Sequence, residues 1–265
     1  MEVKTPGQFP WQPQSFVLGN LAIGNLRQNM LKRLGGENGV HAETLMTAMG
    51  ALAGFACQNA ALTLAAEYTA QHGYLPPHSI MLATTSTGMR HFLGDWINAP
   101  LLGGNSHPFW GFVAAAAIQT GVKADELPEP GPMAGYVAGT IGTPDFGVLR
   151  TPEGHAPVMQ PPDLLTPLWP WCCKLLRLPA PAQMGGEEPP LSETHWPIII
   201  AIVTQQFIGM AKDTLDPRIA ANLALEAAII TAKLDPDAYE AGKWAFKVDD
   251  GRLSVIRKKA APNLN

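Results

Sequence analysis

The sequence predicts a mainly helical α+β protein, built from buried Ala-rich helices with small antiparallel β-hairpins. Three observations predict it. Hydrophobic residues make up 46% of the chain and charged residues only 15%, so much of the chain is expected to be covered. Helical periodicity extends over long segments, whereas strand-like alternation occurs only in short pairs around turns. The chain of 265 residues is long enough for a large core, and we expect one domain over residues 1–265.

The first helix is expected over residues 23–34 and ends at the glycine pair 35–36. Its apolar residues follow one helical face: Ile23, Leu26, Met30, Leu31 and Leu34. The second helix is expected over about residues 41–72. Four small residues lie near one ridge of it, where another helix can approach closely: Gly50, Gly54, Ala61 and Ala65. We interpret this ridge as close packing inside the fold, and an interface with a second copy is the alternative.

Three more helices are expected further along the chain. Short helices are predicted over residues 107–120 and 195–210. A longer helix begins at Asp216, an N-cap followed by a proline at the first helical position, and runs to about residue 234. Because its polar residues form only a narrow stripe, we expect this helix to be mostly buried.

Strand patterns occur as hairpins. At the C-terminal end, apolar and polar residues alternate on both sides of a turn at residues 249–251. A second hairpin is expected over residues 80–93, because Gly88 permits the positive φ that a short loop requires. A helix over Met89–Asn98 is the alternative there. A third hairpin is predicted over residues 146–158.

A Pro-rich segment over about residues 128–190 contains 14 of the 25 prolines. Proline removes a backbone donor, so we expect an irregular excursion from the domain with little regular structure. The apolar residues within 163–178 indicate that this part docks onto the core. Residues 183–190 are expected to form a mobile loop.

The charge balance excludes two classes of partner. With 18 Lys+Arg against 22 Asp+Glu, the net charge of −4 offers no basic surface for a nucleic acid or an anionic membrane. The uncharged stretch 44–66 is long enough to span a membrane, but Gln58 and Asn59 lie at its centre, so we expect a buried helix.

The N-terminal residues carry no leader pattern, and the cysteines show no spacing that fits a zinc site or a disulfide framework. The three cysteines are Cys57, Cys172 and Cys173. We therefore expect a protein of the cytoplasm with reduced thiols, no signal peptide and no transmembrane helix.

Charged residues are scarce over residues 34–122. This tract contains only Glu37, Glu43, Glu67, Arg90 and Asp95. If the tract forms the core, each of the five must reach water or be paired, because an isolated buried charge is costly. Arg90 follows a run of hydroxyl residues, so Arg90, Thr85 and Ser86 are candidates for binding a small anion. We prefer a structural interpretation of Arg90, an ion pair with Glu43, Glu67 or Asp95, and the anion site is the alternative.

The candidate catalytic residues are Glu43, His91 and Asp95. A helix would place His91 and Asp95 on one face, whereas the preferred hairpin places them about 13 Å apart along a strand. Glu43 and His41 are at i and i+2, positions that do not face each other on a helix. The sequence contains no nucleotide-binding loop, nucleophile elbow or metal-ligand spacing, so no cofactor and no metal are expected.

These patterns leave two hypotheses for function. The first is a soluble, cytoplasmic homo-oligomer that acts as a binding or scaffold protein, since low charge and small-residue helix faces favour contact between subunits. The second is an enzyme or sensor for a small anionic metabolite anchored by Arg90. The sequence does not decide whether the protein is an enzyme.

Overall fold

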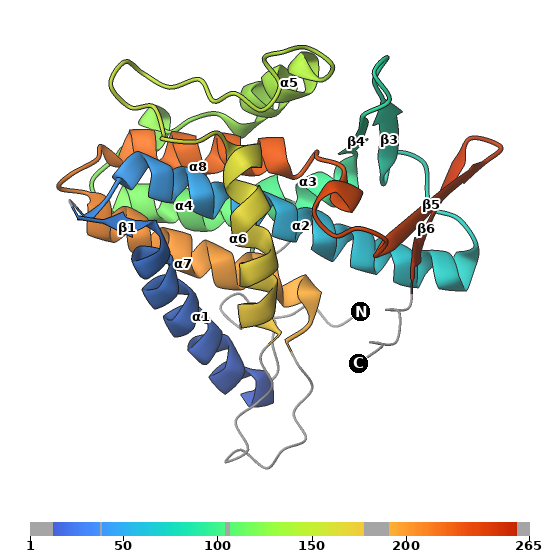
Figure 1. The fold of residues 1–265 in the computed structure, drawn as a ribbon, viewed down its shortest axis with the longest axis horizontal. Helices are drawn as coiled ribbons and strands as arrows, with labels where there is room; N and C mark the ends of the chain where they lie inside the picture. The colour runs from blue at the N-terminus through green and yellow to red at the C-terminus, as the bar shows by residue number, and fades with distance from the viewer. Residues whose placement is uncertain (1–12, 38, 104–106, 178–190, 259–265) are drawn as a thin grey trace.

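The computed structural model describes residues 13–37, 39–103, 107–177 and 191–258, and within them the chain is mainly helical α+β, as predicted (Figure 1). The helices are α1 (Pro13–Leu34), α2 (Ala42–His72), α3 (Asp95–Leu102), α4 (Phe109–Gln119), α5 (Pro130–Thr140), α6 (Pro161–Leu176), α7 (Trp196–Ala211) and α8 (Pro217–Thr231). Three antiparallel hairpins pair β1 (Gly35–Gly36) with β2 (Gly39–Val40), β3 (Met81–Thr84) with β4 (Arg90–Leu93), and β5 (Trp244–Asp249) with β6 (Arg252–Arg257).

Helix α2 runs along the length of the molecule, and α6, α7 and α8 pack against it (Figure 1). Every residue from Thr44 to Thr63 is buried. The helix begins after His41, whose ring accepts a hydrogen bond from the Thr44 backbone N–H, and ends at Gly73 with a φ of 85°. It is the one described helix long and apolar enough to cross a membrane, and its most apolar window is fully buried in the fold.

The backbones of α2 and α8 are in close contact. A Cβ added at Gly50 would overlap the carbonyl of Ala224, and one added at Gly54 would overlap that of Ala228. The hydroxyl of Thr231 also donates a 2.8 Å hydrogen bond to the Ala51 carbonyl across this contact. The glycines of the small-residue ridge therefore serve packing inside the fold, the interpretation that we preferred over an interface between copies.

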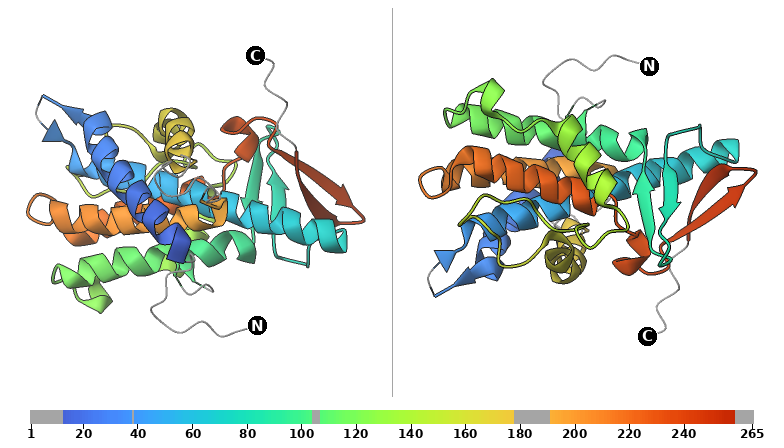
Figure 2. Two further views of the ribbon diagram at one scale, coloured as in Figure 1. Left: turned by 90° about the horizontal axis from the view of Figure 1, so that it is seen from below. Right: turned by 90° about the horizontal axis from the view of Figure 1, so that it is seen from above.

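The predicted helices and two of the three predicted hairpins are confirmed. The β3–β4 and β5–β6 hairpins lie together at the end of the molecule where α2 finishes, as Figure 2 shows. The prediction of a hairpin over residues 146–158 is wrong, because the structure has no strand in this segment. Some of its backbone donors bond to side chains instead, the Arg150 N–H to Glu226 and the Val158 N–H to Thr44, and others close local turns.

The Pro-rich segment contains more regular structure than predicted, because α5 and α6 both lie in it. Each helix has proline in its first turn, where the missing N–H removes no hydrogen bond. Helix α6 also contains Pro167 and Pro170, and it buries Leu165, Leu168 and Trp169, so the docking of this part is confirmed. The predicted loop 183–190 lies outside the described residues, and the single-domain assignment stays a prediction.

Candidate functional site

The β3–β4 hairpin carries the predicted anion-binding residues. Its register pairs Thr84 with Arg90 and Leu82 with Phe92, and Gly88 in the loop has a φ of 84°. The chain then leaves the strand, and α3 begins at Asp95. Residues 89–98 are thus neither one helix nor one continuous strand.

Arg90 is held in an ion pair. Its Nε and Nη2 lie 2.8 and 2.9 Å from the two carboxylate oxygens of Asp235, and Nη2 also lies 2.6 Å from Asp237 Oδ2. The hydrogen bonds to Asp235 and then Asp237 raise the pKa of Arg90 above its usual value. The preferred interpretation, an ion pair of Arg90, is therefore present in the structure, but the expected partners were wrong: Asp235 and Asp237 take the place of Glu43, Glu67 or Asp95.

The other residues predicted near Arg90 do not converge on it. The Thr85 hydroxyl bonds to that of Thr87 at 2.8 Å and accepts from the Met89 N–H, so it closes the turn. Ser86 is exposed in the same turn, and Asp95 is exposed at the start of α3. Neither of the two grooves described below is lined by any of these residues.

His91 is buried, with 3% of its surface exposed, and its ring lies edge-on to Phe146 at 4.7 Å. Burial lowers the pKa of His91, which favours the neutral imidazole. Because Asp95 is exposed on another element, the two residues form no acid–base pair in this structure.

Glu43 lies between two histidines at the start of α2. Its Oε1 is 3.0 Å from His155 Nδ1, and its Oε2 is 3.3 Å from His41 Nε2. Burial by itself would raise the pKa of Glu43, but the hydrogen bond with His155 helps to bring it below its usual value. The expectation that His41 and Glu43 do not face each other is wrong, because His41 is the N-cap and has an extended backbone.

The charge-poor tract behaves as the sequence predicts. Glu37, Glu67 and Asp95 are exposed. Arg90 forms an ion pair with Asp235, and Glu43 contacts His155. The core of the tract is therefore free of unpaired charge.

Sequence reasoning missed a buried lysine at the end of α8. Lys233 is 2% exposed, and the only hydrogen bond of its side chain among the described residues is a long one of 3.5 Å from Nζ to Asn98 Oδ1. Burial lowers the pKa of Lys233 from 10.5 to about 8. Its place after an otherwise apolar helix is visible in the sequence, but the sequence does not show that Asn98 of α3 lies beside it.

A buried carboxylate cluster was also missed. Glu193 Oε1 lies 3.0 Å from Arg177, 3.1 Å from Lys243 and 3.1 Å from Arg257. Burial would raise the pKa of Glu193, but the nearby cations, Lys243 first, bring it below its usual value. The cluster ties the end of α6 to the β5–β6 hairpin, and we interpret it as a structural crosslink.

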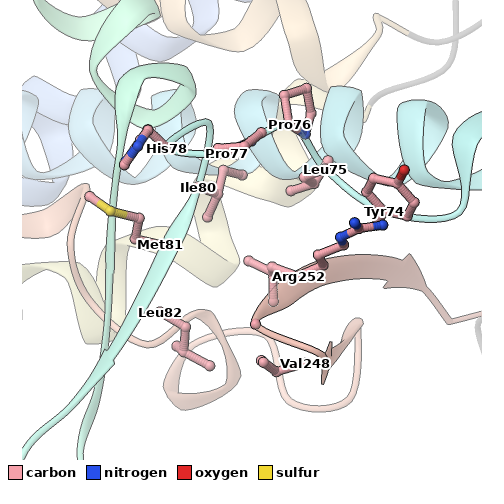
Figure 3. Close-up of a pocket in the computed structure, with 12 residues that line it drawn as sticks. Tyr74, Leu75, Pro76, Pro77, His78, Ile80, Met81, Leu82, Val248 and Arg252 are labelled. Carbon is pink, nitrogen blue, oxygen red and sulfur yellow. The ribbon is translucent and has the colours of Figure 1, made fainter.

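A groove between the β3–β4 and β5–β6 hairpins has a volume of about 580 Å³. Figure 3 shows Met81 and Leu82 of β3 on one side, and Val248 and Arg252 of the other hairpin on the opposite side. The segment between α2 and β3 closes the groove, fixed there by a hydrogen bond from the Leu75 N–H to the Leu253 carbonyl. The groove walls are thus mainly apolar.

Arg252 is the permanent charge in this groove. Its guanidinium lies 4.4 Å from the centroid of the Tyr74 ring, and it has no carboxylate partner among the described residues. The two-residue turn that places it has positive φ at Asp250 (46°) and Gly251 (73°). An arginine without an ion pair is available to an anionic group of a ligand.

Two further observations bear on chemistry. No group of three or more His, Cys, Asp or Glu residues in the described part of the chain is arranged to hold a metal ion. The three cysteines are free and buried, and burial raises the pKa of the Cys57 and Cys172 thiols, which keeps them protonated.

Comparison with known proteins adds no family to these observations. No family model matches the chain, and no curated protein or solved structure compared with it matches either. A functional conclusion must therefore come from the geometry described above.

Proposed function

We propose that this protein is a binding protein for a small apolar ligand that carries one anionic group, taken up in the groove between the two hairpins. The observation that carries the proposal is Arg252, a cation without a carboxylate partner in the described structure, at the side of an apolar groove. The apolar part of the ligand would lie between Met81 and Val248, and the anionic group would face the guanidinium.

The size and exposure of the groove support this proposal. A volume of about 580 Å³ lies within the range of roughly 300–1,000 Å³ that small-molecule sites occupy. Two of its apolar side chains are well exposed, Met81 at 44% and Val248 at 62%. Covering them with a ligand removes apolar surface from water, which favours binding.

The sequence suggested a small anionic ligand bound by Arg90. We keep this class of ligand, but Arg252 replaces Arg90 as the residue that binds its anionic group. Arg90 is unsuited because Asp235 and Asp237 occupy its hydrogen-bonding groups, whereas Arg252 has no such competitor among the described residues. A homo-oligomer in the cytoplasm stays a prediction. The glycines that favoured it pack against α8, so contact between subunits would have to use other surfaces.

The test is a calorimetric titration with octanoate, and with octan-1-ol as the neutral ligand of the same chain length. We expect octanoate to bind more tightly than octan-1-ol, and the Arg252→Gln variant to lose about tenfold in octanoate affinity, the effect of one charge-assisted contact. The matched control is Lys247→Gln, which removes a positive charge from an exposed position on the same hairpin outside the groove.

The control is expected to bind octanoate as the original protein does. The proposal is wrong if octanoate does not bind, if the alcohol binds equally well, or if the Arg252 and Lys247 variants lose the same affinity.

A further inference from the structure

A second groove lies between α2 and α3 and has a volume of about 500 Å³. It shares no lining residue with the hairpin groove. Small side chains, Ala60, Ala61 and Ala99, form part of its surface, and Leu64 of α2 is 47% exposed beside them. The apolar part of this groove is therefore wide enough to take a bulky group.

Two aromatic rings line this groove at right angles to each other. The centroids of Tyr68 on α2 and Trp96 on α3 are 5.5 Å apart, and the ring planes form an angle of 89°. The backbone of Trp96 is fixed by a 2.9 Å hydrogen bond from its N–H to the Ser79 carbonyl. His72 lies 4.2 Å from the Tyr68 ring and supports it. The aromatic corner is thus held by several elements before any ligand arrives.

The charge beside this corner is negative. Glu67 is the only Asp, Glu, Lys or Arg in the lining of the groove. It is exposed, and no cation pairs with it among the described residues. An unpaired carboxylate next to two aromatic rings attracts a cation, because the faces of aromatic rings carry negative potential.

We propose that the α2–α3 groove binds a small quaternary ammonium ion, with the cation between Tyr68, Trp96 and Glu67. A quaternary ammonium carries no N–H, so it needs no hydrogen-bond acceptor from a mainly apolar wall. Its alkyl groups cover the exposed Leu64 and the alanines while the charge is stabilised by the rings and the carboxylate. The site is independent of the hairpin groove and of the function proposed for it.

The test compares choline with 3,3-dimethylbutan-1-ol, which has the same shape without the charge, by calorimetric titration at pH 8. We expect choline to bind and the neutral alcohol to bind at least about fivefold more weakly. Glu67→Gln is expected to lower choline affinity about fivefold, and Trp96→Leu about tenfold. The control is Glu153→Gln, which removes an exposed carboxylate that is not part of the groove lining and should leave choline binding unchanged.

Trp96→Phe separates loss of the cation site from loss of the fold, because it keeps an aromatic ring and should retain part of the affinity that Trp96→Leu loses. Octanoate affinity should be the same in all of these variants. The inference is overturned if choline does not bind, if the alcohol binds as tightly as choline, or if the Glu67 and Glu153 variants behave alike.

Discussion

The α2–α8 pair and the end that carries the two longer hairpins differ in how they place apolar residues. Along α2, burial is continuous from Thr44 to Thr63, and glycine brings its backbone against α8. At the hairpins, large apolar side chains such as Met81 and Val248 remain exposed beside a groove. The helical pair therefore covers its apolar residues inside the fold, whereas the hairpin end leaves apolar side chains open to solvent beside a groove.

The largest expected effect tests the close contact between α2 and α8. Gly54→Ala should lower the free energy of unfolding by more than about 3 kcal/mol, because the new Cβ overlaps the Ala228 carbonyl and the backbone must move. The control is Gly24→Ala on α1, where nothing lies within 4 Å of the added Cβ; it should stabilise the protein slightly. Urea unfolding followed by circular dichroism measures both, and equal effects would contradict the close contact.

A smaller but pH-dependent effect is expected at Lys233. Lys233→Met should raise the free energy of unfolding at pH 7 by on the order of 2–3 kcal/mol, because the charged amine is buried without a carboxylate partner among the described residues. The folded-state pKa of about 8 lies below the ordinary 10.5, so the unfolded chain binds more protons between these values. The original protein therefore gains stability as pH rises from 8 to 10.5.

The advantage of Lys233→Met should accordingly be constant below pH 8 and shrink above it. Urea titrations at several pH values measure the difference in the free energy of unfolding between the original protein and the Lys233→Met variant. Both proteins contain the same other titratable groups, so the contributions of those groups cancel in the difference. Lys247→Met at an exposed site is the control and should show no such trend. A constant difference up to pH 10.5 would mean that the Lys233 amine is not buried as described.

The smallest of these effects concerns the ion pair of the hairpin. Arg90→Ala should lower the free energy of unfolding by about 1 kcal/mol, since the pair is partly exposed, 31% for Arg90 and 26% for Asp235, and water screens it. A double-mutant cycle with Asp235→Asn isolates the pair. The same Arg90 variant should bind octanoate normally, and a loss of binding would return the anion site to Arg90.

The sequence predicted the fold better than the site. The small residues Gly50 and Gly54 marked a close helix contact, although the partner helix was not identified. Arg90 was correctly singled out as a charge that needs a partner, but Asp235 lies 145 residues away along the chain, so no local pattern connects the two. Glu43 and His155, 112 residues apart, were likewise not associated.

Local physical chemistry explains what the sequence determined by itself. The N-cap Asp216, the proline after it and the glycine at residue 88 act within a few residues, so the ends of helices and the turns of hairpins are visible in the chain. Tertiary structure alone decided the position of the grooves, the burial of Lys233 and the lack of a carboxylate partner for Arg252 among the described residues. Each depends on which distant segments pack against one another, and composition and periodicity specify only that a surface is apolar, not what covers it.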